Sequence, residues 1–183
     1  MEENITRLFE AVKSKAYREG EFTLASGQKS SYYIDMKEVT LDGDGILLIG
    51  KAIYPWAMKW GVDAVGGMEL GSVPISTAVC LVAAMEGKNL GNVIVRKETK
   101  GHGTRKAVEG RLFPGMKVAV VEDVVSTGGS SMKAVHALRE AGLEVAGVIS
   151  VVDRLMGGGE LFAREQIPYQ YLMDIRQIRE TVS

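Results

Sequence analysis

Cysteine is almost absent from this chain of 183 residues, which has a single one at position 80. One cysteine excludes an internal disulfide. Cys80 lies in the apolar run ISTAVCLVAA, where a buried small hydrophobic side chain is the ordinary interpretation, so no nucleophilic role is expected. Histidine is also scarce, with two residues, and His136 has no companion metal ligands in its segment, so we expect it to be structural.

Long hydrophobic runs are missing as well. The longest nearly unbroken apolar stretch, residues 73–85, is shorter than the roughly 18–20 residues that cross a bilayer. The first residues, MEENITRLFEAVKSK, mix acids and bases, whereas a secretory signal has a basic start followed by an apolar block. These features predict a cytoplasmic protein without a membrane partner.

Charge of one sign is not in excess over the whole chain. With 22 basic and 23 acidic residues, the net charge of −1 argues against a general nucleic-acid-binding surface. The exception is the segment 96–111, where only two acids accompany the bases Arg96, Lys97, Lys100, Arg105, Lys106 and Arg111. Within it, residues 98–110 contain three glycines and no apolar periodicity, which predicts a long flexible loop of the kind that is often functional.

Alternating apolar segments predict an α/β fold in a single domain spanning residues 1–183. A hairpin is expected over 21–36, and strands are expected at 62–67, 92–97, 116–123, 144–153 and 169–173. Helices are expected at 4–17, 44–60, 74–87 (a buried helix), 130–141, about 160–166 and at the C-terminal end. Pro55 should bend the second helix or mark its boundary. Apolar strands separated by helices predict a central, mainly parallel sheet covered on both faces.

The most informative stretch is residues 118–131, VAVVEDVVSTGGSS. It places two adjacent carboxylates, Glu122 and Asp123, at the end of an apolar strand, where parallel sheets bind ligands. Carboxylates there can accept hydrogen bonds from sugar hydroxyls or help to hold a divalent metal through water. The Ser, Thr and Gly residues that follow precede a helix, so their N–H groups can converge on an anion.

The same stretch also has a simpler interpretation, a turn that caps a helix beside two solvated acids. The apolar strand and both acids in front of the turn favour a ribose-phosphate site instead. No Gly-x-x-x-x-Gly-Lys-Ser/Thr pattern occurs in the sequence, which disfavours an ordinary nucleoside-triphosphate loop.

Residues 118–130 resemble the thirteen-residue phosphoribosyl-pyrophosphate (PRPP) signature of the type I phosphoribosyltransferases. Three further segments, 21–35, 93–103 and 149–154, are similar in order and spacing to the orotate phosphoribosyltransferase family, and the likeness covers nearly the whole chain. The resemblance implies the type I phosphoribosyltransferase fold with a small N-terminal hood and a long flexible catalytic loop. The hood would comprise about residues 1–40 and the C-terminal segment, and the loop about residues 98–110.

The resemblance also implies an activity, the transfer of ribose 5-phosphate from PRPP to orotate in pyrimidine (UMP) biosynthesis. The products would be orotidine 5′-monophosphate and diphosphate. The cofactor would be Mg²⁺, held mainly through PRPP and water rather than by protein ligands. The chain would form a homodimer in which the loop of one subunit reaches the active site of the other.

Site residues follow from the same resemblance. The catalytic residues would be Lys100, His102 and Asp123. Diphosphate would be bound by the loop residues Arg96, Lys97, Lys100 and His102. The remainder of PRPP would be bound by the ribose-binding acids and the segment after them, namely Glu122, Asp123, Val124, Val125, Ser126, Thr127, Gly128, Gly129 and Ser130. Orotate would be bound by Ser126 and Arg154, with help from the Tyr33-Ile34 region of the hairpin.

Two positions depart from the family pattern. Ala25 and Gly71 stand where many bacterial members have lysine, so the hairpin and the segment 69–72 are less expected to supply side-chain contacts. Two other functions remain open from the residues alone. One is a phosphoribosyltransferase for another base, and the other is a non-catalytic regulator that binds PRPP.

Overall fold

The structure is a computed structural model that describes residues 2–23, 27, 29–97 and 107–180. Its centre is a six-stranded sheet with the order β5-β4-β3-β6-β7-β8. The strands are β3 (Ala64–Met68), β4 (Gly91–Val95), β5 (Val108–Glu109), β6 (Lys117–Val125), β7 (Glu144–Asp153) and β8 (Tyr169–Asp174). All neighbours pair in parallel except β4 and β5, which are antiparallel. The predicted mainly parallel sheet is confirmed.

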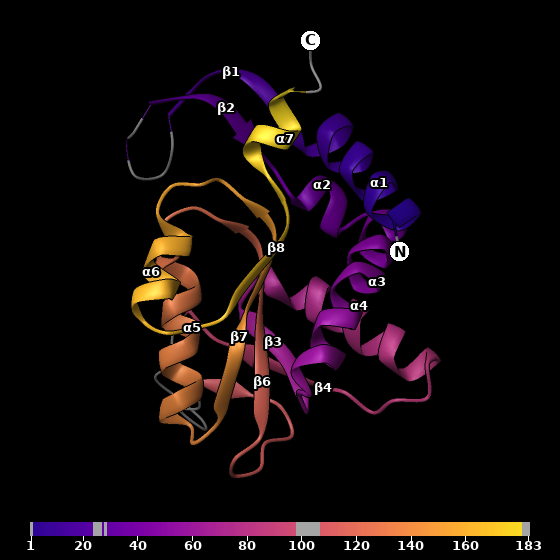
Figure 1. Cartoon of the computed structure of the whole chain (residues 1–183), viewed down its shortest axis with the longest axis vertical. Helices are drawn as coiled ribbons and strands as arrows, with labels where there is room; N and C mark the ends of the chain where they lie inside the picture. Colours follow the sequence, from indigo (N-terminus) through magenta and orange to yellow (C-terminus); the bar gives the residue numbers. More distant parts are fainter. Residues whose placement is uncertain (1, 24–26, 28, 98–106, 181–183) are drawn as a thin grey trace.

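Helices cover both faces of this sheet, as the two-sided apolar strands require (Figure 1). On one face lie α1 (Glu2–Ala11), α3 (Gly43–Trp60) and α4 (Ser72–Met85), which pack with β3, β6 and β7 around one apolar cluster. On the other face lie α5 (Gly129–Glu140) and α6 (Gly158–Arg164), which pack around a second cluster. The strand β6 contributes to both clusters, because Val118 and Val120 point to one and Ala119 and Val121 to the other.

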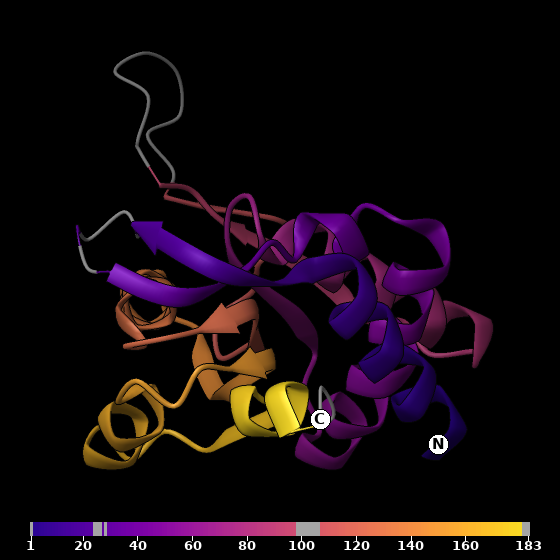
Figure 2. The same cartoon turned by 90° about the horizontal axis from the view of Figure 1, so that it is seen from above.

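A separate two-stranded hairpin extends over the carboxyl end of the sheet (Figures 1 and 2). Its strands are β1 (Tyr17–Thr23) and β2 (Lys29–Ile34), paired antiparallel from Tyr17 opposite Ile34 to Thr23 opposite Lys29. The short helix α2 (Lys37–Thr40) follows the hairpin, and α7 (Ile175–Glu180) lies beside it near the C-terminal end. These elements occupy the place expected of the hood.

Two sequence predictions about element boundaries are wrong. The first helix does not reach residue 17: it ends at Ala11, passes into a π-helix, η1 (Val12–Ala16), and Tyr17 already belongs to β1. Val12 and Ala16 are both fully buried, so their helical spacing gave no sign of the change. The hairpin therefore begins at Tyr17, earlier than the predicted residue 21. Backbone pairing with β2 holds this segment, although its sequence does not alternate apolar and polar residues. Of the two effects predicted for Pro55, a bend or a boundary, the boundary is excluded, because Pro55 lies inside the continuous helix α3.

The predicted loop 98–110 contains the strand β5 at its end, where Val108 pairs opposite Val95 of β4. Residues 98–106 of that loop lie outside the described residues. The described part has no helix long and apolar enough to span a membrane.

The helix predicted as buried, α4, has one exposed apolar side. Leu81 and Met85 are 62% and 77% exposed, whereas Ile75 and Val79 are fully buried. Because the helix is apolar all round, the sequence pattern could not show which side is uncovered. Cys80 is partly buried rather than fully buried as expected. Its Sγ donates to the Gly91 carbonyl at 3.3 Å, and burial raises the pKa of the thiol to about 11.

Candidate active site

A pocket of about 360 Å³ lies at the carboxyl end of the sheet, between the hairpin and the end of β6. Its walls come from segments far apart in the sequence. The hairpin and α2 contribute one side, the start of α4 another, and β4, β6 and β7 contribute the residues that follow or end them. Of the predicted site residues, the pocket brings together Lys97, Asp123, Val124, Ser126 and Arg154.

The two adjacent acids occupy different environments. Glu122 is only 6% exposed, and its Oε2 accepts a 3.0 Å hydrogen bond from the hydroxyl of Ser131 on α5. Burial, followed by the charge of Asp123, raises the pKa of Glu122 to about 8. Asp123 lines the pocket, and its Oδ1 accepts the N–H of Val124 at 2.7 Å. Burial also raises the pKa of Asp123. Asp123 is therefore the acid that faces a ligand, while Glu122 lies beneath it.

The Ser-Thr-Gly-Gly-Ser segment forms the turn from β6 into α5. Gly128 adopts the left-handed conformation, with φ of 80°, and a Cβ at this position would lie 3.1 Å from the Phe162 ring. Thr127, Gly129 and Ser130 are exposed. The N–H groups in the first turn of a helix have no acceptor within it, and that end carries positive partial charge. The turn thus presents free donors beside the pocket, as an anion site requires.

Arg154 is the one arginine in the pocket lining. Its backbone N–H donates to the Val125 carbonyl at 2.8 Å, which ties the residue after β7 to the end of β6. Nη1 of its guanidinium approaches Oγ of Ser126 at 3.5 Å. In the described part of the chain, no carboxylate forms an ion pair with Arg154. Its positive charge is therefore available to an anionic ligand.

The basic segment is only partly placed. Lys97 lines the pocket, and its backbone N–H donates to Oε1 of Glu69 at 2.9 Å. Arg96 is outside the pocket lining and pairs with Glu109 at 3.6 Å; its buried Nε has no hydrogen-bond partner among the described residues. The predicted catalytic residues Lys100 and His102 lie outside the described residues.

Sequence reasoning missed a second lysine of the pocket, Lys37 on α2. Its Nζ lies 3.0 Å from Oδ1 of Asp35, and this contact raises the pKa of Lys37. The charge of Lys37 also works to lower the pKa of Asp123, against the larger effect of burial. Lys37 belongs to no quoted motif, and only the folding of α2 beside β6 brings it to the site.

Gly71, where many relatives have lysine, lies directly against the acid. A Cβ at this position would be 3.0 Å from Oδ2 of Asp123. The described pocket therefore takes its lysine charge from Lys37 and Lys97 rather than from position 71.

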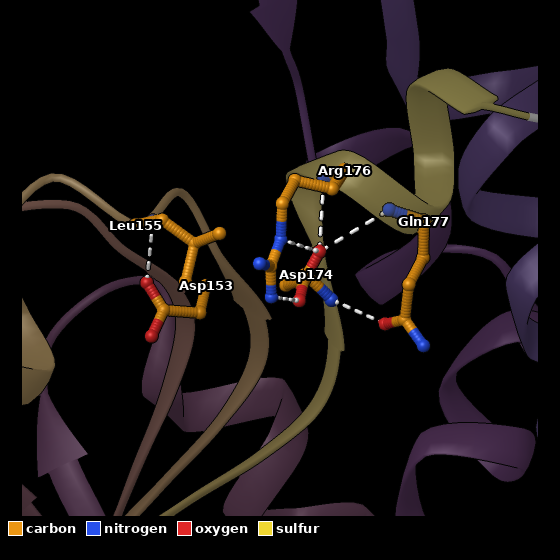
Figure 3. Close-up of polar contacts among 5 residues, drawn as sticks. All are labelled: Asp153, Leu155, Asp174, Arg176 and Gln177. Atoms are coloured by element: carbon orange, nitrogen blue, oxygen red, sulfur yellow. Dashed lines mark hydrogen bonds and ion pairs between the residues drawn. The ribbon is translucent and has the colours of Figure 1, made fainter.

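Two further acids fix the ends of β7 and β8 (Figure 3). Asp153 and Asp174 are neighbours in the parallel register, and each is 3% exposed. Oδ1 of Asp153 accepts the N–H of Leu155 at 2.7 Å, which shapes the turn that contains Arg154. Asp174 and Gln177 form a reciprocal cap at the start of α7, each accepting the other's backbone N–H. These acids hold the frame of the pocket and do not line it.

Comparison with known proteins agrees with this geometry. The family described as "Phosphoribosyl transferase domain" matches residues 47–163. The orotate phosphoribosyltransferase of Aquifex aeolicus (strain VF5) is 46% identical over 176 residues, which are 96% of each chain. This chain belongs to the orotate phosphoribosyltransferase family.

Solved structures of the family confirm the predicted type I phosphoribosyltransferase fold. The orotate phosphoribosyltransferase of Mycobacterium tuberculosis H37Rv in complex with Fe(III) dicitrate matches with a TM-score of 0.85 at 34% identity, covering 96% of this chain and 99% of that one. The same enzyme in complex with PRPP matches with a TM-score of 0.80 at 32% identity, covering 96% and 98%.

The donor set for a metal is sparse. Among the described residues, no group of three or more His, Cys, Asp or Glu side chains could hold a metal ion. The pocket lining offers the carboxylates of Asp35, which is paired with Lys37, and Asp123. Two carboxylates are too few to surround a cation. They fit a cation that takes most of its ligands from substrate and water.

Proposed function

We propose that this chain is an orotate phosphoribosyltransferase, which transfers ribose 5-phosphate from PRPP to orotate and releases diphosphate. The observation that carries the proposal is one pocket lined by Asp123, Ser126 and Arg154, that is, an acid, the start of the turn before α5 and an arginine that forms no ion pair within the described residues. The relatives that share this name match over nearly the whole chain.

The ribose 5-phosphate moiety of PRPP binds at the end of β6. Its phosphate accepts hydrogen bonds from the turn 126–130, where the first turn of α5 provides free N–H groups and positive partial charge. The exposed hydroxyls of Thr127 and Ser130 add donors. Asp123 accepts hydrogen bonds from the ribose hydroxyls. Glu122 lies buried beneath Asp123 and is anchored by the hydrogen bond that it accepts from Ser131.

Orotate carries a carboxylate, and Arg154 binds it. A planar guanidinium can pair with a carboxylate through two parallel hydrogen bonds, which fixes the orientation of the base as well as its affinity. Ser126 lies beside Arg154 and contacts the same base. Tyr33 and Ile34 of the hairpin close the other side of the pocket.

Departure of diphosphate leaves positive charge on the ribose ring and negative charge on the leaving oxygens. Stabilising that separation of charge is the chief contribution a protein can make. Lys97, with Arg96, Lys100 and His102 from the same basic segment, supplies the positive charge. Asp123 could help to hold a Mg²⁺ ion that takes most of its ligands from substrate and water, and such an ion would supply positive charge against the leaving group. Closure of the loop over the site excludes water that would capture the ribosyl centre.

The chain acts as a homodimer with shared active sites. Leu47 of α3 and Leu81 and Met85 of α4 line an apolar groove of about 540 Å³ on the outer side of the two helices. A helix that is apolar all round is normally covered, so this side of α4 supports contact with a second copy. The same helix begins at the pocket, next to Gly71, so that α4 runs from the pocket to this apolar groove. A cytoplasmic location and a role in UMP biosynthesis complete the proposal.

A spectrophotometric assay tests the activity. The protein is mixed with orotate, PRPP and Mg²⁺, and the ultraviolet absorbance of orotate is followed. Loss of the orotate absorbance with release of diphosphate is expected. Turnover of a purine base or another pyrimidine, with none of orotate, would show that the enzyme acts on that base instead. Binding of PRPP without diphosphate release from any base would mean a regulator rather than an enzyme.

A further inference from the structure

Arg154 is held by a side chain that does not itself line the pocket. Its Nε donates a 3.1 Å hydrogen bond to the hydroxyl of Tyr32, and its guanidinium carbon lies 4.8 Å from the centre of the Tyr32 ring. The second side-chain contact of Arg154, with Ser126, is longer at 3.5 Å. Tyr32 is therefore the principal side-chain partner of this guanidinium among the described residues.

Tyr32 is itself fixed by its surroundings. Its ring centre lies 6.0 Å from that of Tyr17, which is 9% exposed and pairs with Ile34, two residues further along the strand of Tyr32. The guanidinium carbon of Arg179 on α7 lies 5.8 Å from the same Tyr32 ring. The hairpin and the C-terminal helix thus both contact the one residue that orients Arg154.

The contact with Tyr32 leaves the terminal nitrogens of the guanidinium able to bind a carboxylate. Nε is occupied by Tyr32, and Nη1 has only the long contact with Ser126, so the terminal nitrogens keep donors for an incoming carboxylate. A flexible arginine that must pair through two nitrogens loses less freedom on binding when a neighbour has already set its plane. The stacked ring adds a cation–π contact that holds the same plane.

We infer that Tyr32 is a positioning residue for the base: it orients Arg154 for the carboxylate of orotate without touching orotate. The inference rests on the proposed function, because it takes orotate as the anion that Arg154 binds. It assigns Tyr32 a task separate from that of its neighbour Tyr33, which lines the pocket.

The test begins with Tyr32→Phe, which keeps the ring and removes the hydroxyl. Loss of a hydrogen bond to a charged group is expected to lower kcat/KM for orotate roughly tenfold and to change KM for PRPP less than about twofold. Tyr32→Leu, which also removes the ring, should lower kcat/KM for orotate further. Tyr54→Phe on α3, away from the pocket lining, is the matched control and should match the wild type.

A double-mutant cycle separates positioning from a general structural effect. Arg154→Lys keeps the positive charge but removes the Nε–H group that donates to the Tyr32 hydroxyl. In the Arg154→Lys background, adding Tyr32→Phe should change kcat/KM for orotate less than about twofold, because the bond it removes is already gone. Melting temperatures of all variants are measured alongside.

Each outcome decides the matter. An equal proportional effect of Tyr32→Phe in both backgrounds, or equal effects on orotate and PRPP, would overturn the positioning role. So would a lower melting temperature with unchanged kinetics. If the wild type turns over orotate and Tyr32→Phe matches it, only this inference fails. If the wild type leaves orotate unchanged, the proposed function fails and takes this inference with it.

Discussion

The hydroxyl of Ser131 donates to Oε2 of Glu122 at 3.0 Å, and both residues are buried. The bond joins the end of β6 to the first helical turn after the anion-binding loop. This bond lowers the pKa of Glu122 but only partly offsets the effect of burial. The acid pair is consequently a source of pH-dependent stability.

The free energy of unfolding of the ligand-free protein should fall as the pH rises from about 4.5 to about 8, owing to Glu122. A carboxyl whose pKa is raised in the folded state favours folding fully below its unfolded pKa and loses that contribution as the pH passes its folded pKa. Glu122→Gln should remove the part of this decline that is due to Glu122, worth on the order of 2 kcal/mol or more. Urea unfolding at several pH values measures it.

Glu140→Gln, on the exposed side of α5, is the control for loss of one negative charge. It should keep the slope of the wild type. If the free energies of unfolding of Glu122→Gln and of the wild type changed equally with pH over this range, the pKa of Glu122 would not be raised in the folded protein.

Lys100→Ala should lower kcat far more than it weakens PRPP binding. The reason is that the charge it would neutralise on the leaving oxygens develops mainly in the transition state. Steady-state kinetics and PRPP titration measure the two effects separately. Lys88→Ala, at an exposed site after α4, serves as a charge-matched control and should behave as the wild type. Unchanged kcat in Lys100→Ala would remove Lys100 from the role of leaving-group partner.

Mixing two inactive variants tests whether subunits share their sites. Lys100→Ala and Asp123→Ala subunits, combined by refolding or co-expression, should regain about a quarter of wild-type activity per active site if dimers assort randomly and one of the two sites in each mixed dimer is intact. Each variant alone is the control. Mixed dimers that stay inactive would show that each chain supplies its own Lys100 and Asp123.

Gly128→Ala should destabilise the protein and weaken PRPP binding. The substitution demands a left-handed backbone from alanine and places its Cβ 3.1 Å from Phe162, at a cost on the order of 2 kcal/mol. Gly142→Ala separates the two causes, since Gly142 has a similar φ of 79° with nothing within 4 Å of its Cβ position. It should cost about 1 kcal/mol and leave PRPP binding unchanged. Thermal unfolding and PRPP titration report both quantities; equal losses in the two variants would rule out a contribution from Phe162.

The order of strands and helices was predictable because its signals are local. The β-branched runs of β6 and β7 and the glycine after α5 are readable without knowing the rest of the chain. The same holds for the anion turn, because acids, serines and glycines follow one another within a single connection. Asp123 and Ser126 could therefore be named in advance from the residues, whereas Arg154 was named only through the family resemblance.

Residues that reach the site through tertiary packing were not predictable in this way. Lys37 and Tyr32 are brought to β6 and β7 by the hairpin and α2, whose position depends on contacts more than a hundred residues away in the sequence. The exposed side of α4 was hidden for a different reason: an apolar helix gives no periodicity from which its uncovered face can be read.

The separate hairpin has a consequence for how such proteins diversify. The residues proposed to bind the sugar phosphate lie at the end of β6 and the start of α5, whereas the opposite wall of the pocket comes from a two-stranded unit with its own backbone pairing. Because Tyr32 of that small unit contacts Arg154, remodelling the hairpin would change how the base is held while the ribose-phosphate cradle stays intact. The way the base is held and the site for the ribose phosphate can thus change independently of each other.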